Sequence, residues 1–271
     1  MRQSFGYWNT MASGPKLPFR IFALGALRIE GPDGPLTGDW LGQRPGELLR
    51  FLVCERDRIV PADAIGEAIW PHTGPAAPNT VRHFVHALRE RLQPGRSARS
   101  HPSPVICRRG GYGLDPERVW VDADEFEREA QRGVSAVAGL REPDTQARAH
   151  LERAVGLYGG DFLSDELYGE WALGERERLR SAASDALRAL VRIDGSSAEV
   201  RAELLERLAE LEPFDDDVQR ELISAWLRMG RRSRAVRQYE SFRARLLHQF
   251  GTLPEFDLAQ LVRALTRPRC A

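Results

Sequence analysis

The chain has 271 residues, with 39 Lys and Arg against 39 Asp and Glu, 42% hydrophobic and 29% charged residues. This composition is ordinary for a globular protein, and at roughly 100 to 200 residues per domain the length predicts two domains. No apolar run approaches the ~18 residues that cross a bilayer, and the N-terminal residues contain no signal-peptide core. We therefore expect a cytoplasmic protein.

The net charge of zero conceals an asymmetry along the chain. Residues 1–120 hold 16 basic and 11 acidic residues, a net charge of +5, which leaves −5 for residues 121–271. A basic half joined to an acidic half indicates different partners for the two halves. Cys54, Cys107 and Cys270 match no CxxC or Cys/His ligand spacing, so the sequence predicts neither a disulfide framework nor a zinc site.

The N-terminal half begins with an aperiodic segment, residues 1–18, which we predict to be disordered. Short β-prone runs follow at Phe19–Leu24 and Leu27–Glu30. The turn-forming residues 31–35 then precede a third run, Leu36–Leu41. This part is predicted to form a small antiparallel sheet.

Three helices are predicted next, at Pro45–Cys54, Pro61–Trp70 and Asn79–Leu92. Gly46 weakens the first helix by about 1 kcal/mol relative to alanine. We interpret a glycine at this helical position as a sign of close packing there. After a polar loop, Val105–Leu114 reads as two short strands around a double-glycine turn. Strands, three helices and a hairpin in this order predict a winged helix-turn-helix.

The third helix is amphipathic and carries the candidate DNA-reading residues. At 100° per residue its apolar residues gather on one stripe, and Asn79, Arg82, His83 and His86 gather on the opposite face. Hydrogen-bonding groups on such a face can read base edges in the major groove. For one helix alone a solvated face would be the better interpretation, but the flanking helix and hairpin favour DNA binding.

Residues beside this face are predicted to hold DNA phosphates or to act from the wing. They are Thr80, Arg89, Arg91, Arg108, Arg109 and Tyr112.

No enzyme is indicated. His83 and His86 are spaced for a shared metal, but no Cys, Asp or Glu cluster completes a site. The carboxylates of residues 161–170 and 215–217 have no visible partner nucleophile. The P-loop and dinucleotide-binding motifs are both missing. We therefore expect no catalytic residues, no metal and no cofactor.

Beyond Asp122 the sequence is helical throughout, with apolar residues three and four positions apart. Asp122 itself is a candidate helix cap. The order of Pro213, Leu222, Trp226, Gly230, Ala235 and Tyr239 matches one tetratricopeptide repeat. A generic helical bundle is the alternative to a tetratricopeptide-like domain.

These residues together resemble the Streptomyces antibiotic regulatory proteins. The landmarks are Gln43-Arg44, Ile59-Val60, Ala68-Ile69-Trp70, Asn79-Thr80-Val81, Val85 with Leu88-Arg89, Gly110 to Leu114, Asp122 with Phe126, Leu157 to Leu163, Trp171, and Gly251 with Pro254. The resemblance covers about residues 19–266. Two departures are Pro45-Gly46 in place of a leucine-rich opening and the acidic stretch of residues 212–217.

The resemblance implies an α+β, OmpR-like winged helix-turn-helix followed by an all-α, tetratricopeptide-like bacterial transcriptional activation domain. We expect a disordered segment at 1–18, the DNA-binding domain at 19–116 and the activation domain at 121–267. The implied function is pathway-specific activation of an antibiotic or other secondary-metabolite gene cluster at the nucleoid.

The implied partners are promoter DNA and RNA polymerase. The family binds direct repeats near the −35 region and contacts sigma region 4 and the alpha C-terminal domain of the polymerase. We expect monomers in solution and a side-by-side pair of protomers on DNA. The alternatives are a protein-interaction scaffold with weak DNA binding, and a repressor that acts by steric occlusion.

Overall fold

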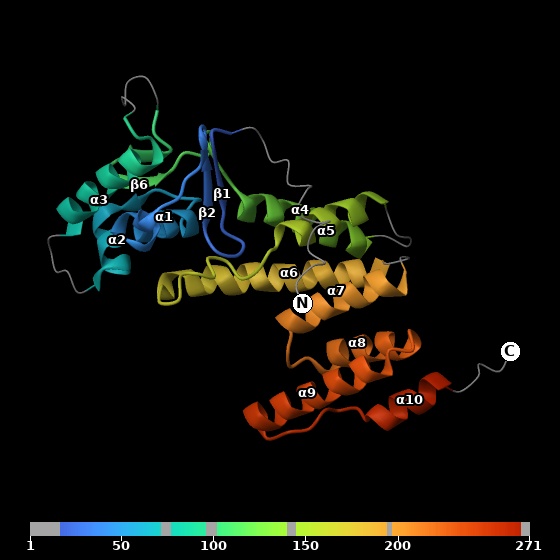
Figure 1. Cartoon of the computed structure of the whole chain (residues 1–271). Helices are drawn as coiled ribbons and strands as arrows, with labels where there is room; N and C mark the ends of the chain where they lie inside the picture. Colours follow the sequence, from blue (N-terminus) through green and yellow to red (C-terminus); the bar gives the residue numbers. More distant parts are fainter. Residues whose placement is uncertain (1–16, 72–76, 96–101, 140–144, 194–196, 267–271) are drawn as a thin grey trace. The chain divides into compact units, whose positions relative to one another are not determined.

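The computed structural model describes residues 17–71, 77–95, 102–139, 145–193 and 197–266 (Figure 1). They form two compact units, each made of two stretches of chain. The first unit contains residues 17–129 and 153–181, and the second contains 130–152 and 182–266. The segment predicted to be disordered lies outside the described residues except for Leu17 and Pro18.

A four-stranded sheet opens the first unit. Its strands are β1 (Phe19–Phe22), β2 (Arg28–Gly31), β3 (Gly34–Pro35) and β7 (Val119–Val121), in the order β3-β2-β1-β7. Strand β1 pairs antiparallel with β2 and parallel with β7, so that Ile21 lies between Ile29 and Val121. All three of these side chains are buried, and residues directly opposite each other on paired strands share one face of the sheet.

The prediction of a third strand at Leu36–Leu41 is wrong. Strand β3 ends at Pro35, and a 3-10 helix, η1 (Asp39–Gly42), follows it. Gly38 takes a φ of 128°, which turns the chain so that the Trp40 ring is buried and its Nε1 donates to the Thr37 carbonyl at 3.2 Å.

The expected close packing of Gly46 is confirmed, since a Cβ there would lie 2.1 Å from the Leu41 carbonyl oxygen.

The winged helix-turn-helix is confirmed. Its helices are α1 (Arg44–Cys54), α2 (Ala62–Ile69) and α3 (Ala77–Leu92). A second sheet consists of β4 (Val60–Pro61), β5 (Val105–Arg108) and β6 (Gly111–Leu114), in the order β4-β6-β5. Strand β4, which the sequence analysis did not predict, attaches the hairpin to the helices.

Asp122 connects the first sheet to helix α4 (Asp122–Gly139). One carboxylate oxygen accepts from the Ala23 N–H at 2.8 Å, and the other accepts from the Leu24 N–H at 3.1 Å. Burial raises the pKa of this carboxyl to about 6, although these N–H groups oppose the shift. The side chain expected to cap a helix therefore anchors the chain just after β1.

Two arginines of the winged helix bind carboxylates that follow it in sequence. Arg56, whose side chain is 4% exposed, pairs with Glu175 at 2.8 Å, with Glu127 at 3.1 Å and with Asp124. Arg50 pairs with Asp165. These carboxylates belong to α4, to the segment after α5 (Thr145–Leu157), and to α6 (Leu173–Ile193), which follows the short η3 (Glu170–Ala172). The first unit therefore includes part of the helical half.

The second unit is helical and contains α7 (Ala198–Leu211), α8 (Asp216–Arg228), α9 (Arg232–Phe250) and α10 (Leu258–Thr266). Helices α8 and α9 follow the predicted repeat register. Leu222, Trp226 and Ala235 are buried, and Gly230 takes the left-handed conformation between the two helices, with a φ of 71°. Asp215 caps α8 by accepting from the Val218 N–H at 2.9 Å.

The variant Asp122→Asn should lower the free energy of unfolding by about 1 to 3 kcal/mol. An amide has only one oxygen, so its NH2 group must face the N–H of either Ala23 or Leu24. Urea unfolding of the full chain measures the change. Asp185→Asn on the exposed face of α6 is the control, with an expected change within about 0.5 kcal/mol. Equal stability of the two variants would contradict the anchoring role of Asp122.

Candidate nucleic-acid interface

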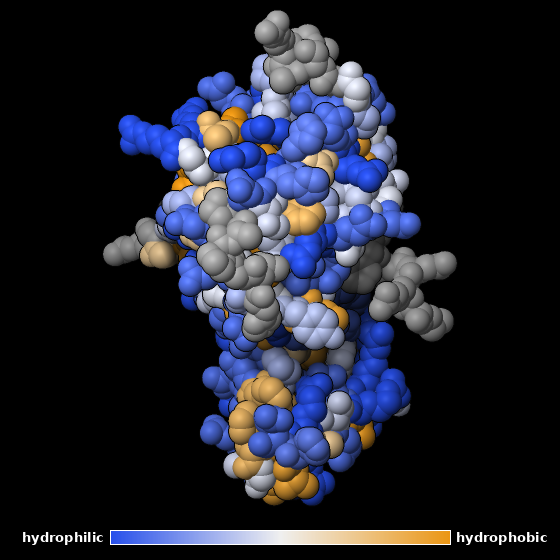
Figure 2. All heavy atoms as spheres, turned by 90° about the vertical axis from the view of Figure 1, so that its left-hand side faces the viewer, coloured by the Kyte–Doolittle hydropathy of each residue, from blue (hydrophilic) through white to orange (hydrophobic). Residues whose placement is uncertain are grey.

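Helix α3 separates an apolar face from a polar face, as predicted. Val81, Val85 and Leu88 are at most 2% exposed and pack into the first unit. On the other side Asn79, Arg82, His83 and His86 are all exposed. The structure therefore brings the four predicted base-facing residues onto one accessible face. Figure 2, which views the molecule from the side where α3 lies in Figure 1, shows a mainly hydrophilic upper surface.

Trp70, at the end of α2, holds α3 against α1. Its indole N–H donates to the Glu47 carboxylate at 2.8 Å, and its ring lies 5.0 Å from the Phe84 ring. The Arg44 guanidinium covers the Trp70 ring at 5.1 Å. Because aromatic and cation-π contacts fix both position and angle, this cluster sets the direction in which the polar face of α3 points. From the sequence, Arg44 is only a landmark of the family resemblance, and neither its role here nor that of Glu47 is predicted.

The polar face is preorganised in one place. Arg82 donates from Nη1 to the Asn79 Oδ1 at 3.3 Å, and these residues are neighbours because they lie three positions apart on a helix. His83 lies against the Phe84 ring at 5.3 Å. Arg91, near the end of the helix, is exposed, and Thr80 is half-buried at its start.

The hairpin of β5 and β6 forms the wing. Arg108 pairs with Gly111, so Arg109 and Gly110 form a two-residue turn, with φ values of 51° and 81°. Gly111 is required beside β4, because a Cβ there would lie 2.7 Å from the Val60 carbonyl oxygen. Arg108 and Arg109 are both exposed, so the tip of the wing carries two cations.

Two of the residues predicted to hold DNA phosphates, Arg89 and Tyr112, are instead engaged within the protein. Arg89 donates from Nε and Nη2 to the Val105 carbonyl, at 3.2 and 2.8 Å. Tyr112 is 6% exposed and lies on β6, opposite Val60 and Cys107. The Arg89 side chain therefore ties β5 of the wing to α3, whereas Tyr112 is buried in the sheet of the wing. Sequence patterns alone do not predict the Arg89 contact, because it joins residues from separate elements.

Metal and nucleophile chemistry receive no support from the described residues. Within them, no three or more His, Cys, Asp or Glu side chains gather as a metal site would require. Burial raises the pKa of the Cys54 thiol to about 12, which keeps it protonated at neutral pH. Cys107 is exposed on the wing, and Cys270 lies outside the described residues.

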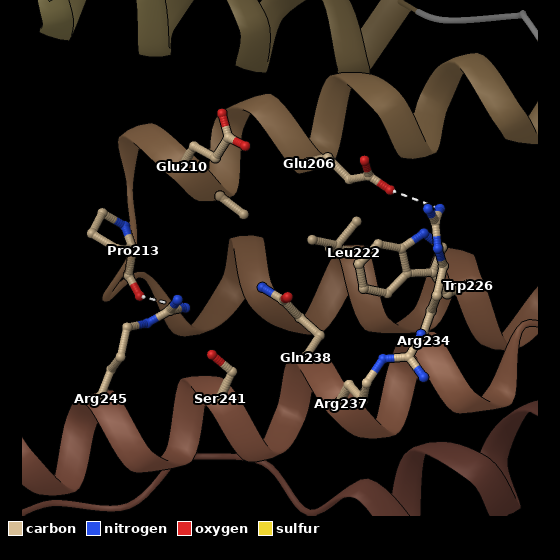
Figure 3. A pocket seen from close by; sticks show the side chains of 11 residues that line it. Glu206, Glu210, Pro213, Leu222, Trp226, Arg234, Arg237, Gln238, Ser241 and Arg245 are labelled. Carbon is tan, nitrogen blue, oxygen red and sulfur yellow. Dashed lines mark hydrogen bonds and ion pairs between the residues drawn. The ribbon is translucent and has the colours of Figure 1, made fainter. Parts of the chain in front are cut away.

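A cavity of about 580 Å³ lies in the second unit between α7, α8 and α9 (Figure 3). Leu222 and Trp226 of α8 line its apolar side, and Glu206, Glu210, Arg234, Arg237, Gln238, Ser241 and Arg245 line its polar sides. Arg234 pairs with Glu206 at 3.3 Å, whereas Arg237 makes no hydrogen bond or ion pair with the described residues. This arrangement can accept an acidic peptide segment.

Two protein families match the chain. The family described as "Bacterial transcriptional activator domain" matches residues 121–266. The chain belongs to this family. The family described as "Transcriptional regulatory protein, C terminal" matches residues 40–112, which run from η1 to β6. Together the two matches identify a transcriptional activator of the Streptomyces antibiotic regulatory protein family, and not an enzyme.

Two of its relatives are named as regulatory proteins. The activator is 27% identical to the regulatory protein DnrI of Streptomyces peucetius, over 84% of this chain and 85% of that protein. It is 27% identical to the regulatory protein AfsR of Streptomyces griseus, over 81% of this chain but only 22% of that protein.

A solved structure shares the fold. It is Mycobacterium tuberculosis EmbR in complex with a low-affinity phosphopeptide, with a TM-score of 0.63 and 24% identity. The likeness covers 92% of this chain and 65% of that one. At this identity it shows the fold alone. No helix in the described ranges of the activator is long and apolar enough to span a membrane.

The variant Arg109→Asn should keep the wing folded and weaken DNA binding. Asparagine tolerates the left-handed conformation and is favoured in such turns, so the free energy of unfolding should not fall. Loss of one phosphate contact should reduce the slope of log K against log salt by about 0.9. Fluorescence anisotropy at several salt concentrations measures the slope, with exposed Arg228→Asn as the control. An unchanged slope for Arg109→Asn would exclude the turn from the interface.

Proposed function

We propose that this activator binds promoter DNA sequence-specifically through the exposed face of α3 and the wing. The main observation is that Asn79, Arg82, His83 and His86 share one exposed face on a helix whose other face is buried. Hydrogen-bonding side chains on such a helix match the donors and acceptors of base edges in the major groove. Exposed cations beside it supply affinity for the DNA backbone.

The phosphate contacts are assigned to groups that lie around this face. Thr80 and Arg91 lie at the two ends of the helix, and Arg108 and Arg109 lie at the tip of the wing. Arg89 acts indirectly, by holding the wing beside α3 through the Val105 carbonyl, and Tyr112 acts from within the sheet of the wing, where it is buried. This division predicts different effects for residues that contact bases and residues that contact phosphates.

We further propose that two copies bind side by side on direct repeats near the −35 region and recruit RNA polymerase through sigma region 4 and the alpha C-terminal domain. The regulated genes would be an antibiotic or other secondary-metabolite cluster, since DnrI and AfsR are regulatory proteins of Streptomyces. The protein would act in the cytoplasm, at the nucleoid.

One observation favours a second binding function. The cavity of the second unit combines an apolar side with an arginine, Arg237, that has no partner among the described residues. This arrangement suits a protein segment with an acidic residue beside an apolar one. The scaffold alternative is therefore compatible with DNA binding in the same chain.

Footprinting of the full chain on its neighbouring promoters, with and without RNA polymerase holoenzyme, tests the proposal. We expect protection of spaced direct repeats that becomes stronger with polymerase. Protection that excludes polymerase would make the protein a repressor. No protection at low salt would favour the scaffold alternative.

The variants Arg82→Ala and Arg91→Ala should separate base contacts from phosphate contacts. Arg82→Ala should cost about 1 to 3 kcal/mol on the preferred site and less on random DNA. Arg91→Ala should weaken binding to both DNAs about equally and reduce the salt dependence. Titrations of each variant on both DNAs measure the difference. Equal losses on the two DNAs for Arg82→Ala would remove Arg82 from the base-reading set.

A further inference from the structure

Two consecutive apolar residues of the first unit project into solvent. Leu167 is 75% exposed and Tyr168 is 90% exposed, the largest values among the exposed large hydrophobic residues of the described chain. Single exposed apolar residues are common on protein surfaces. A neighbouring pair on a well-held segment, beside a cavity, is typical of a binding site.

The segment that carries this pair is held firmly by backbone and side-chain hydrogen bonds. Arg176 donates to the carbonyls of Phe162, Leu163 and Glu166, at 2.9, 3.2 and 2.9 Å. The Leu163 and Ser164 N–H groups donate to the Ala23 and Gly25 carbonyls. A preorganised segment loses little conformational entropy when a partner binds.

Asp165, two residues before Leu167, fixes the segment to the winged helix. Its carboxylate accepts from the Leu27 N–H at 3.0 Å and from the Arg50 guanidinium. The exposure of Leu167 and Tyr168 is therefore a fixed feature of the first unit.

A cavity of about 270 Å³ lies beside Tyr168. Ala68, Ile69, Pro71 and Trp171 supply its apolar lining, and Glu47, Glu166 and Glu170 supply its carboxylates. None of the described residues that line it is Lys or Arg. Glu47 accepts from the Trp70 indole, and Glu166 lies 3.9 Å from Arg50. The Glu170 carboxylate makes no hydrogen bond or ion pair with any described residue.

The charge of this cavity selects the class of partner. Carboxylates repel DNA phosphates, so this face is unsuited to DNA. An arginine or lysine has an apolar stem and a cationic end, which match the apolar lining and the free Glu170. The surface therefore suits a basic protein partner that also offers an apolar hollow for Tyr168.

We propose that Leu167, Tyr168 and the adjacent acidic cavity are a docking surface for a basic, partly apolar protein surface of RNA polymerase holoenzyme. The assignment rests on the proposed function, because it names the part of the activator that polymerase contacts. The surface and α3 belong to one compact unit, so a partner docked there is held at a fixed position relative to the bound DNA.

The test compares wild type with the double variant Leu167→Ala and Tyr168→Ala in the full chain. Both side chains are exposed, so the fold should persist, and DNA binding without polymerase should stay unchanged. The gain in promoter occupancy on adding holoenzyme, and the run-off transcription, should fall about tenfold or more, as expected when a central aromatic anchor is removed. The control is Leu247→Ala, near the end of α9, together with Leu253→Ala, just after that helix. These two leucines are also exposed, at 54% and 56%, and their removal should change neither readout.

The charge variant Glu170→Lys tests the cavity separately. It should reduce the polymerase-dependent gain in promoter occupancy and leave DNA binding without polymerase no weaker than in wild type.

A wild type whose promoter occupancy does not rise on adding polymerase would overturn both the proposed function and this assignment. A wild-type gain that the variants retain in full would overturn the assignment and leave the proposed function standing. Variants that change only the cooperative binding of two copies would place the surface between protomers and overturn the assignment.

Discussion

The first unit depends on one buried guanidinium, that of Arg56. It lies just after α1 and reaches Asp124, Glu127 and Glu175, which come from two later helices. Burial alone would lower the pKa of Arg56, but the carboxylates of Asp124 and Glu175 raise it above its ordinary value, so the charge is retained. Removing one partner of a buried ion pair typically costs about 3 to 5 kcal/mol, because the remaining charges stay buried without compensation. Arg56 therefore commits the winged helix to packing with the start of the activation domain.

The helix that we propose to read DNA and the segment of residues 158–172 belong to one compact unit, although about eighty residues separate them in sequence. DNA binding alone then fixes where that segment lies on a promoter. The second unit contributes a separate cavity between α7, α8 and α9 (Figure 3).

Local patterns were enough to predict the helices and the exposed face of α3, because helical periodicity lies within one segment. Strands β4 and β7 were missed, since they have two and three residues and pair with strands distant in sequence. Arg89 and Arg109 show what sequence patterns could not predict about the candidate DNA interface. Both are basic and near the hairpin, yet one donates to a carbonyl of β5 while the other is exposed in the turn. Only the tertiary structure separates these two roles.

Hydrogen exchange of the full chain with Arg56→Met tests most directly whether the winged helix and residues 158–172 fold as one unit. Cooperative units open together, with a common free energy. If they fold as one unit, α1 and residues 158–172 should lose protection together, by a similar factor, while α8 and α9 remain as protected as in wild type. Loss of protection in residues 158–172 alone, with α1 unchanged, would show instead that the two parts fold independently.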